Sequence, residues 1–223
     1  MSFAAAAKAD HMPELDFSIE TAASVEHAAA PLLSFTLRAT TAPLQTIHSI
    51  ALRCQIWIEP AKRRYQPREQ GRLVELFGEP ARWGQTLRSM LWTNATVIVP
   101  PFTGSATFDL PIACTHDFNV AAAKYFDALE DNLVPLRFMF SGTIFHAGPD
   151  GHLQVAQIPW SKEAAFSLPV AAWKQMMDSH YAGAAWLFLR KDTFDQLYQY
   201  KTTHGLTSWE AAIERLLTGK EAS

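Results

Sequence analysis

The densest group of side chains that could do chemistry is the run Cys114-Thr115-His116-Asp117. Alternate residues of a strand share a face, so the Cys114 thiol and the His116 imidazole could approach each other as a nucleophile and its base. Asp117 follows His116 too closely to orient it in the usual way, and the sequence shows none of the surroundings that lower the pKa of a thiol. Two interpretations stay open: a small cysteine/histidine-dependent enzyme, or a strand end followed by a turn-forming aspartate.

The chain has two cysteines, Cys54 and Cys114. Each falls at the apolar position of an alternating segment, where a free thiol usually behaves as a small buried hydrophobe. There is no CxxC pair, so the spacing typical of a thioredoxin-like redox site or a zinc knuckle is missing. We therefore expect both thiols to lie in the core.

Two histidines, His146 and His152, flank the turn Gly148-Pro149-Asp150-Gly151 and suggest a pair of metal ligands. A connecting loop with an even number of residues would place them on opposite faces of the hairpin, and no third ligand is evident. The GxSxG, GxxxxGK[ST] and GxGxxG motifs of hydrolases and nucleotide-binding proteins are also missing. The sequence therefore indicates no metal and no other cofactor.

Basic residues concentrate between residues 62 and 88, where seven Lys and Arg accompany three Glu. This segment has a net charge of +4, against −7 for the rest of the chain. A basic island on an insertion is a natural docking surface for an acidic protein partner. The residues expected to bind that partner are Lys62, Arg63, Arg64, Arg68 and Arg72. We expect them to be exposed, so that reversing Arg63, Arg64 and Arg68 to Glu would leave the fold intact.

The composition of the 223 residues is that of a globular protein, with 48% hydrophobic and 18% charged residues. A net charge of −3 disfavours wholesale binding to nucleic acid. The apolar runs are shorter than the roughly 20 residues that span a bilayer, and the start MSFAAAAKAD makes a poor signal peptide. These features predict a cytoplasmic protein without a membrane span.

The elements that position these residues follow from the hydrophobic pattern. Alternation with a period of two predicts strands, over residues 15–20, 33–40, 47–59, 90–99, 107–114, 134–146 and 152–158, with a short one ending at 168. Helical spacing predicts a helix over 67–77, which Pro67 begins and Gly78 caps. A short helix after Pro80 completes a helical insertion at about 60–90.

Further helices are predicted over 119–130 and after Pro169, with Trp173, Met176, Met177 and His180 on one face. The short apolar run 186–189 reads as an edge strand. Two last helices begin near Asp192 and after Ser208, the second within a capping box and ending at Gly219.

The fold class expected from this order is α+β, an antiparallel β-sandwich-like core with a helical insertion and C-terminal helices. Residues 1–12 are predicted to be a mobile tail and 13–168 the β-rich core. Residues 169–219 are predicted to form a helical part packed on that core.

Several strings together resemble one family: Pro13–Phe17, Leu73–Pro80, Val99–Gly104, Ala121–Tyr125, Phe140–Thr143 and Leu206–Trp209. They are similar to an uncharacterised bacterial family, a domain of unknown function, whose genes lie near nickel-iron uptake hydrogenase clusters. The resemblance covers the chain from Pro13 to Leu217 and brings no catalytic residues with it. It implies a hydrogenase-associated role.

The residues restrict what that role can be. An iron–sulfur electron carrier needs about four cysteines and a GTP-driven maturation factor needs a phosphate loop, and this sequence has neither. We therefore expect a non-catalytic accessory or assembly protein whose acidic partner is a hydrogenase subunit or assembly factor. The alternatives are the Cys114/His116 enzyme and a chaperone-like binder of an apolar ligand or unfolded chain, the latter from architecture alone.

Overall fold

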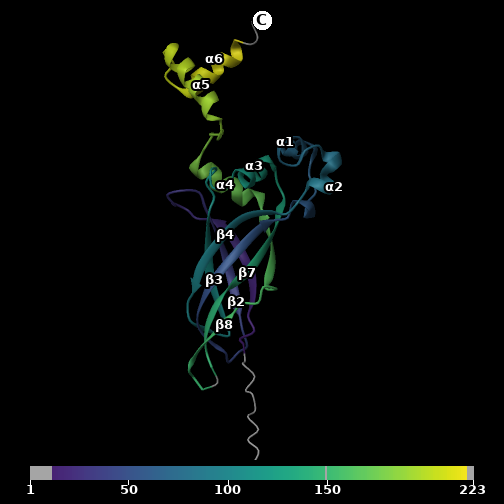
Figure 1. Ribbon diagram of the computed structural model, residues 1–223, viewed down its shortest axis with the longest axis vertical. Coiled ribbons are helices and arrows are strands. Elements are labelled where there is room, and N and C mark those ends of the chain that lie inside the picture. The colour runs from purple at the N-terminus through teal and green to yellow at the C-terminus, as the bar shows by residue number, and fades with distance from the viewer. Residues whose placement is uncertain (1–11, 149, 220–223) are drawn as a thin grey trace, which may run out of the picture. The chain divides into compact units, whose positions relative to one another are not determined.

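The computed structural model of the protein describes residues 12–148 and 150–219. Within it the chain divides into two compact units, one ending at Gly183 and the other beginning at Ala184 (Figure 1). The tail predicted over 1–12 lies outside the described residues except for Met12.

The first unit contains two antiparallel sheets, which confirms the predicted α+β sandwich-like fold. One sheet has the strand order β1-β2-β6, and the other β4-β3-β7-β8, with β5 paired to β3 and β9 paired to β7. The strands are β1 (Asp16–Ser24), β2 (Leu32–Thr40), β3 (Thr46–Ile58), β4 (Met90–Val99), β5 (Phe102–Thr103), β6 (Ser105–Ala113), β7 (Leu133–Ala147), β8 (Leu153–Gln157) and β9 (Glu163–Pro169).

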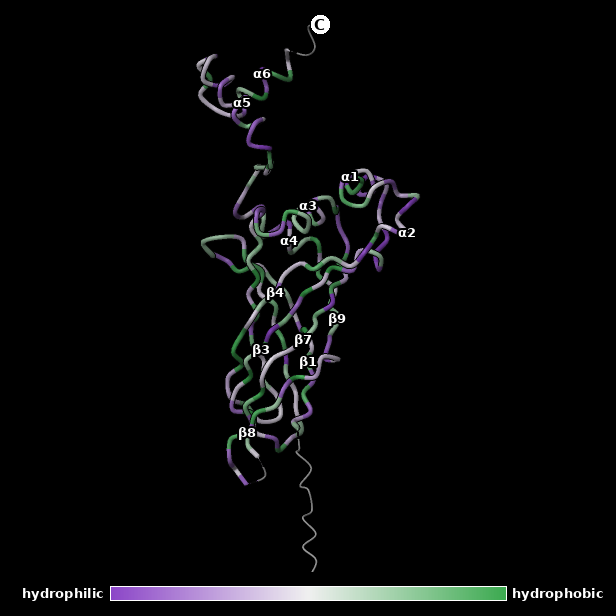
Figure 2. Tube along the Cα trace, viewed as in Figure 1, coloured by the Kyte–Doolittle hydropathy of each residue, from purple (hydrophilic) through white to green (hydrophobic). Residues whose placement is uncertain are grey.

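Alternation along the strands directs one set of side chains into the core between the sheets. In β2 every second residue from Leu33 to Ala39 is fully buried, and Figure 2 shows apolar and polar stretches along the strands of the two sheets. Phe35 of β2 meets Phe138 of β7 with ring centroids 5.2 Å apart. Aromatic contacts of this kind join the two sheets.

The first unit also contains helices gathered at one end of the sheets (Figure 1). They are α1 (Pro67–Phe77), α2 (Trp83–Thr86), α3 (Val120–Ala128) and α4 (Val170–His180), with 3₁₀ turns at Pro60–Lys62 and Pro80–Arg82. The predicted insertion is therefore confirmed: α1 begins at Pro67, and Gly78 ends it with φ 72°. Among the described residues, no helix of either unit is long and apolar enough to cross a membrane.

The second unit consists of α5 (Lys191–Thr203) and α6 (Trp209–Thr218). The capping box predicted over Thr207–Glu210 lies at the start of α6, but the cap is Ser208, whose hydroxyl accepts a hydrogen bond from the N–H of Ala211 at 3.0 Å. The strand expected over 186–189 is not formed, since residues 184–190 belong to no helix or strand. The packing of residues 169–219 as one helical part on the core stays a prediction.

Candidate functional site

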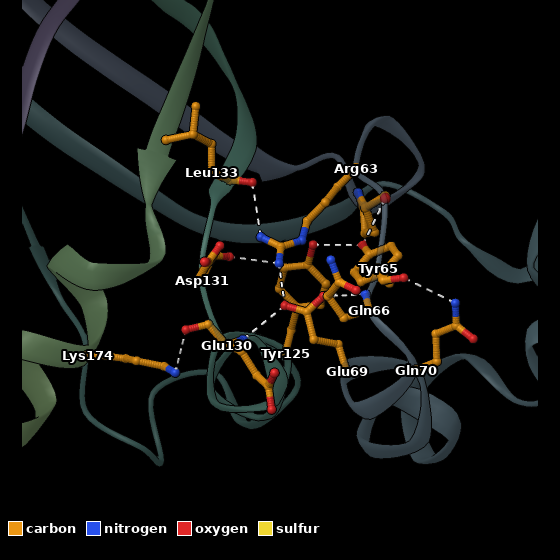
Figure 3. Close-up of polar contacts among 11 residues, drawn as sticks. Arg63, Tyr65, Gln66, Glu69, Gln70, Tyr125, Glu130, Asp131, Leu133 and Lys174 are labelled. Atoms are coloured by element: carbon orange, nitrogen blue, oxygen red, sulfur yellow. Dashed lines mark hydrogen bonds and ion pairs between the residues drawn. The ribbon is translucent and has the colours of Figure 1, made fainter.

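A buried ion pair between Arg63 and Glu69 fixes the helical insertion to the rest of the first unit (Figure 3). The two side chains are only 3% and 1% exposed. A charge removed from water is stable only when its hydrogen-bonding groups are satisfied. Backbone groups bind both Glu69 oxygens and both terminal nitrogens of Arg63, whereas the buried Arg63 Nε has no hydrogen-bond partner among the described residues.

The Arg63 guanidinium donates to two carbonyls from the segment that enters β7. Its Nη1 lies 3.1 Å from the Leu133 oxygen and its Nη2 lies 2.8 Å from the Asp131 oxygen. The Glu69 carboxylate accepts from the backbone N–H of Gln66 and of Glu130, each at 2.9 Å. Glu69 thereby closes the N-terminus of α1 and ties it to the end of α3, so one ion pair holds three segments together.

Aromatic packing extends this anchor. The Tyr65 hydroxyl lies 2.8 Å from the Pro60 oxygen and 2.9 Å from the Tyr125 hydroxyl on α3. The rings of Phe77 and Trp83 pack edge-on against each other, and Phe77 also meets Tyr125. Burial raises the pKa of Tyr125 to about 12 and raises that of Tyr65 still further. The cluster is thus neutral at physiological pH and serves to fix α1 on α3.

The remaining residues of the predicted docking surface separate into two kinds. Lys62 is exposed and lies 3.5 Å from the Glu59 carboxylate. Arg64, Arg68 and Arg72 are exposed and have no ion pair within residues 12–148 and 150–219. We call these three residues the basic face. Arg63 does not belong to it, because its guanidinium is buried in the anchor.

The two arginines of the basic face that lie on α1 are spaced so that their charges destabilise the helix. Arg68 and Arg72 are four residues apart on α1, where like charges destabilise an isolated helix by about 0.2–0.5 kcal/mol. The anchor fixes the helix that carries them. The arrangement is suited to electrostatic binding of an acidic surface, and these three arginines offer no group for proton transfer or nucleophilic attack.

The structure does not favour chemistry at Cys114. The residue is 2% exposed, and its Sγ lies 3.2 Å from the Ile112 oxygen, to which the thiol donates. Burial raises the pKa of the Cys114 thiol to about 12, so the nucleophilic thiolate is disfavoured. The His116 imidazole lies 3.9 Å from the Asp127 carboxylate and packs against Tyr181. Cys54 is likewise buried, as expected, with a pKa raised to about 12.

The histidines at the β7–β8 turn differ from the expectation. Ala147 pairs with Leu153, so the connecting loop is 148–152, with five residues rather than an even number. His146 is 3% exposed and His152 is exposed. Across the part of the chain that the structure describes, there is no group of three or more His, Cys, Asp or Glu that could hold a metal ion.

A surface hollow of about 560 Å³ lies over β3, β4 and β7. It forms around Gly142, where a side chain is impossible because a Cβ would lie 2.1 Å from the Ala51 oxygen. Arg53, Thr96 and Ser141 contribute polar groups to its lining. Leu52, Val97 and Ile98 contribute apolar groups, so the lining of the hollow is mixed.

Comparison with known proteins identifies the family. The model of a family of unknown function, DUF6084, matches residues 12–223. The chain belongs to this family. The match confirms the resemblance to a domain of unknown function that the sequence strings indicated. No curated protein matches the chain in sequence.

Solved structures outside the family show only distant likeness. A CARDB domain from Pyrococcus furiosus, solved with di-metal ions, is 9% identical over 70% of this chain and 91% of its own, with a TM-score of 0.27. A putative late embryogenesis abundant protein is 12% identical over 71% and 73%, with a TM-score of 0.31. The putative ApaA protein of Bordetella pertussis is 14% identical over 70% and 93%, with a TM-score of 0.23. At these TM-scores the likenesses carry no argument about this member of the family.

Sequence reasoning missed the role of Glu69, although one signal was present. Glu69, Leu73 and Phe77 are spaced four residues apart and share the buried face of α1. A carboxylate on the apolar stripe of a helix requires a buried partner. A neighbouring arginine was the natural candidate for that partner.

Proposed function

We propose that this protein is a non-catalytic accessory or assembly factor that binds an acidic protein partner through the basic face, which Arg64 and two arginines of α1 form. The observation that carries the proposal is the contrast within five neighbouring basic residues. The Arg63 guanidinium is buried in its ion pair with Glu69, whereas Arg64, Arg68 and Arg72 remain exposed without an ion pair among the described residues.

A fixed helix improves binding, because side chains and backbone that are already ordered lose less entropy on association. The hydrogen bonds that Arg63 donates and Glu69 accepts order α1 before any partner arrives. The exposed charge then attracts an acidic patch over about 8 Å at physiological salt. Complementary charge of this kind raises association rates and selects partners.

The family resemblance suggests which partner to test. It implies an association with nickel-iron hydrogenase systems in bacteria, so hydrogenase subunits and their assembly factors are the first candidates, in the cytoplasm. The role would be that of a binding protein, because the described residues provide no metal cluster to carry nickel or iron.

The experiment is a comparison of two triple variants in a pulldown from the native host, read by mass spectrometry. Replacing Arg64, Arg68 and Arg72 by Glu should abolish capture of the partner at low salt. Replacing the same residues by Lys keeps the charge and should retain capture. Circular dichroism checks that both variants fold. Equal, salt-independent capture by the two folded variants would contradict the proposal.

A further inference from the structure

The hollow over β3, β4 and β7 is lined by side chains of one face of the larger sheet. Alternate residues of a strand share a face, so Arg53 lies in a row with its register partners, Thr96 of β4 and Ser141 of β7. The next row along the strands consists of Ile98, Ala51, Thr143 and Gln157. The volume of about 560 Å³ lies in the range of small-molecule sites.

Among the described residues that line the hollow, Arg53 alone carries a charge. The described strands contain two other arginines, and both are paired. Arg38 pairs with Glu20, and Arg137 pairs with Glu59 at 3.0 Å. Arg53 has no ion pair and no side-chain hydrogen bond within residues 12–148 and 150–219. The hollow therefore presents one cation that the described chain does not neutralise.

The sheet itself provides no carboxylate for Arg53. Opposite charges on facing strand residues stabilise a sheet, but both register partners of Arg53 carry hydroxyls. Its diagonal neighbours are uncharged as well: Asn94, Ile98, Met139 and Thr143. Glu163 of β9 is the one acidic residue in the described strands of this sheet, and its carboxylate lies 3.9 Å from the Arg137 guanidinium. The Arg53 charge thus remains for an external anion.

Hydroxyl groups add hydrogen-bond donors around the guanidinium. The Gln157 Nε2 donates to the Thr143 Oγ1 at 3.2 Å, so the Thr143 O–H can itself donate to a ligand. The Thr96 and Ser141 side chains line the same hollow. A guanidinium presents a planar fork of donors that matches the two oxygens of a carboxylate. Donors from three strands are therefore available to one small oxyanion.

Apolar side chains follow the hollow along the strands, away from Arg53. Ile98 is 69% exposed, and the small Ala51 lies beside it in the second row. In the row after that, Phe145 of β7 pairs with Val155 of β8, which is 58% exposed. Consecutive rows are about 7 Å apart, because a strand rises about 3.3–3.4 Å per residue. A ligand with its charged end at Arg53 would therefore meet apolar groups along its other end.

We infer that this hollow binds an aliphatic monocarboxylate, with its carboxylate on Arg53 and its chain over Ala51 and Ile98 toward Val155. One cation balances one negative charge, which favours a carboxylate over a phosphate monoester with a charge of about −1.5 to −2. The exposed apolar row favours a ligand with a hydrocarbon chain over an inorganic anion. The inference does not rest on the proposed function, because the basic face is formed by other residues.

The first test titrates the full chain with octanoate at constant ionic strength and follows its backbone amides by NMR. Signals of β3, β4 and β7 around the hollow should shift and saturate, while those of α1 should not. Octanamide has the same chain without the charge and should bind at least about tenfold more weakly. Affinity should rise from butyrate to octanoate by up to about fourfold for each added CH₂. Inorganic phosphate should bind more weakly than octanoate.

The second test changes the lining of the hollow. Arg53→Gln keeps most of the side-chain length but removes the charge, so it should weaken octanoate binding about tenfold or more. Arg82→Gln is the matched control, an exposed arginine outside the hollow and the basic face, and should leave binding unchanged. Ala51→Phe should weaken binding without any change of charge, because it fills the hollow.

Circular dichroism and urea denaturation check that the three variants fold. Retained octanoate binding in Arg53→Gln would overturn the inference, as would equal binding of octanoate and octanamide. The same conclusion would follow if the wild type showed no saturable shift with octanoate, or if inorganic phosphate bound as tightly.

Discussion

The helical insertion of the first unit and the second unit are both small helical regions, but they differ in what holds them. In the insertion, Glu69, Leu73 and Phe77 are buried and an internal ion pair joins α1 to α3 and β7. In the second unit, α5 has no buried residue and α6 has one, Ala212. The insertion is therefore held by its own buried residues and presents charge, whereas the second unit presents apolar side chains such as Leu187, Phe188 and Leu217.

This contrast assigns different physics to the two surfaces. Binding at the basic face is electrostatic and should weaken with salt. Contacts made by the exposed apolar side chains of the second unit should instead persist or strengthen with salt.

The largest loss of stability is expected from breaking the ion pair between Arg63 and Glu69. Arg63→Ala leaves the Glu69 carboxylate buried without its partner, so it should lower the free energy of unfolding by about 3–5 kcal/mol. Urea denaturation measures the change. Arg64→Ala is the matched control and should cost no more than about 1 kcal/mol, because this side chain is exposed.

A double replacement sharpens this prediction. Arg63→Met with Glu69→Leu removes both charges, so its cost should be much smaller than that of Arg63→Ala. If Arg63→Ala and Arg64→Ala cost the same, the ion pair is not the anchor and the contrast between the two regions is lost.

Alkaline pH should destabilise the first unit next. Burial raises the pKa of Cys54 and Cys114 from 9.0 to about 12, so between these values the unfolded chain ionises and the folded chain does not. The stabilisation is complete below pH 9 and is lost as pH rises toward 12, by up to about 1.4 kcal/mol per pH unit for each thiol.

Urea denaturation at pH 8, 9.5 and 10.5 checks this pH dependence. The Cys54→Ala/Cys114→Ala double variant serves as control and should show a shallower decline over that range. An identical decline in the two proteins would show that the thiols are not responsible.

At neutral pH, removing a thiol is expected to have a smaller effect on stability. Cys114→Ala should cost about 1 kcal/mol of stability through lost packing and should leave partner binding intact. A thiol reagent should modify the native protein only as fast as it unfolds. Rapid labelling of Cys114 at pH 7, or loss of cellular function in a folded Cys114→Ala variant, would instead favour the enzyme hypothesis.

The smallest effect is expected from removing the second unit. Ending the chain after Gly183 should change the unfolding free energy of the first unit by no more than about 0.5 kcal/mol, because its core lies before that residue. Thermal and urea unfolding measure it. A large loss of stability would show that residues 184–219 pack on the core.

Local signals account for what the sequence predicted correctly. Helix α1 was predictable at both ends because Pro67 and Gly78 act through their own backbone geometry. Strand β2 was predictable from alternation, because every second residue from Leu33 to Ala39 is apolar and buried. The sandwich followed from the number and spacing of such strands.

The anchor could not be predicted in the same way. Arg63 and Arg64 are neighbours of one type, and only contacts with Asp131 and Leu133, about 70 residues away, bury one and not the other. The run 186–189 shows the converse: its pattern is that of a strand, yet in the described chain residues 184–190 belong to no helix or strand. The local pattern alone decides neither case.

The central claim is that the basic face binds an acidic partner, and the association rate with the captured partner tests it most directly. Arg68→Glu should slow association and flatten its dependence on ionic strength. Arg53→Glu makes the same charge change at an exposed position on β3 and should have the smaller effect. Equal rates and equal salt dependence for the two variants would contradict the claim.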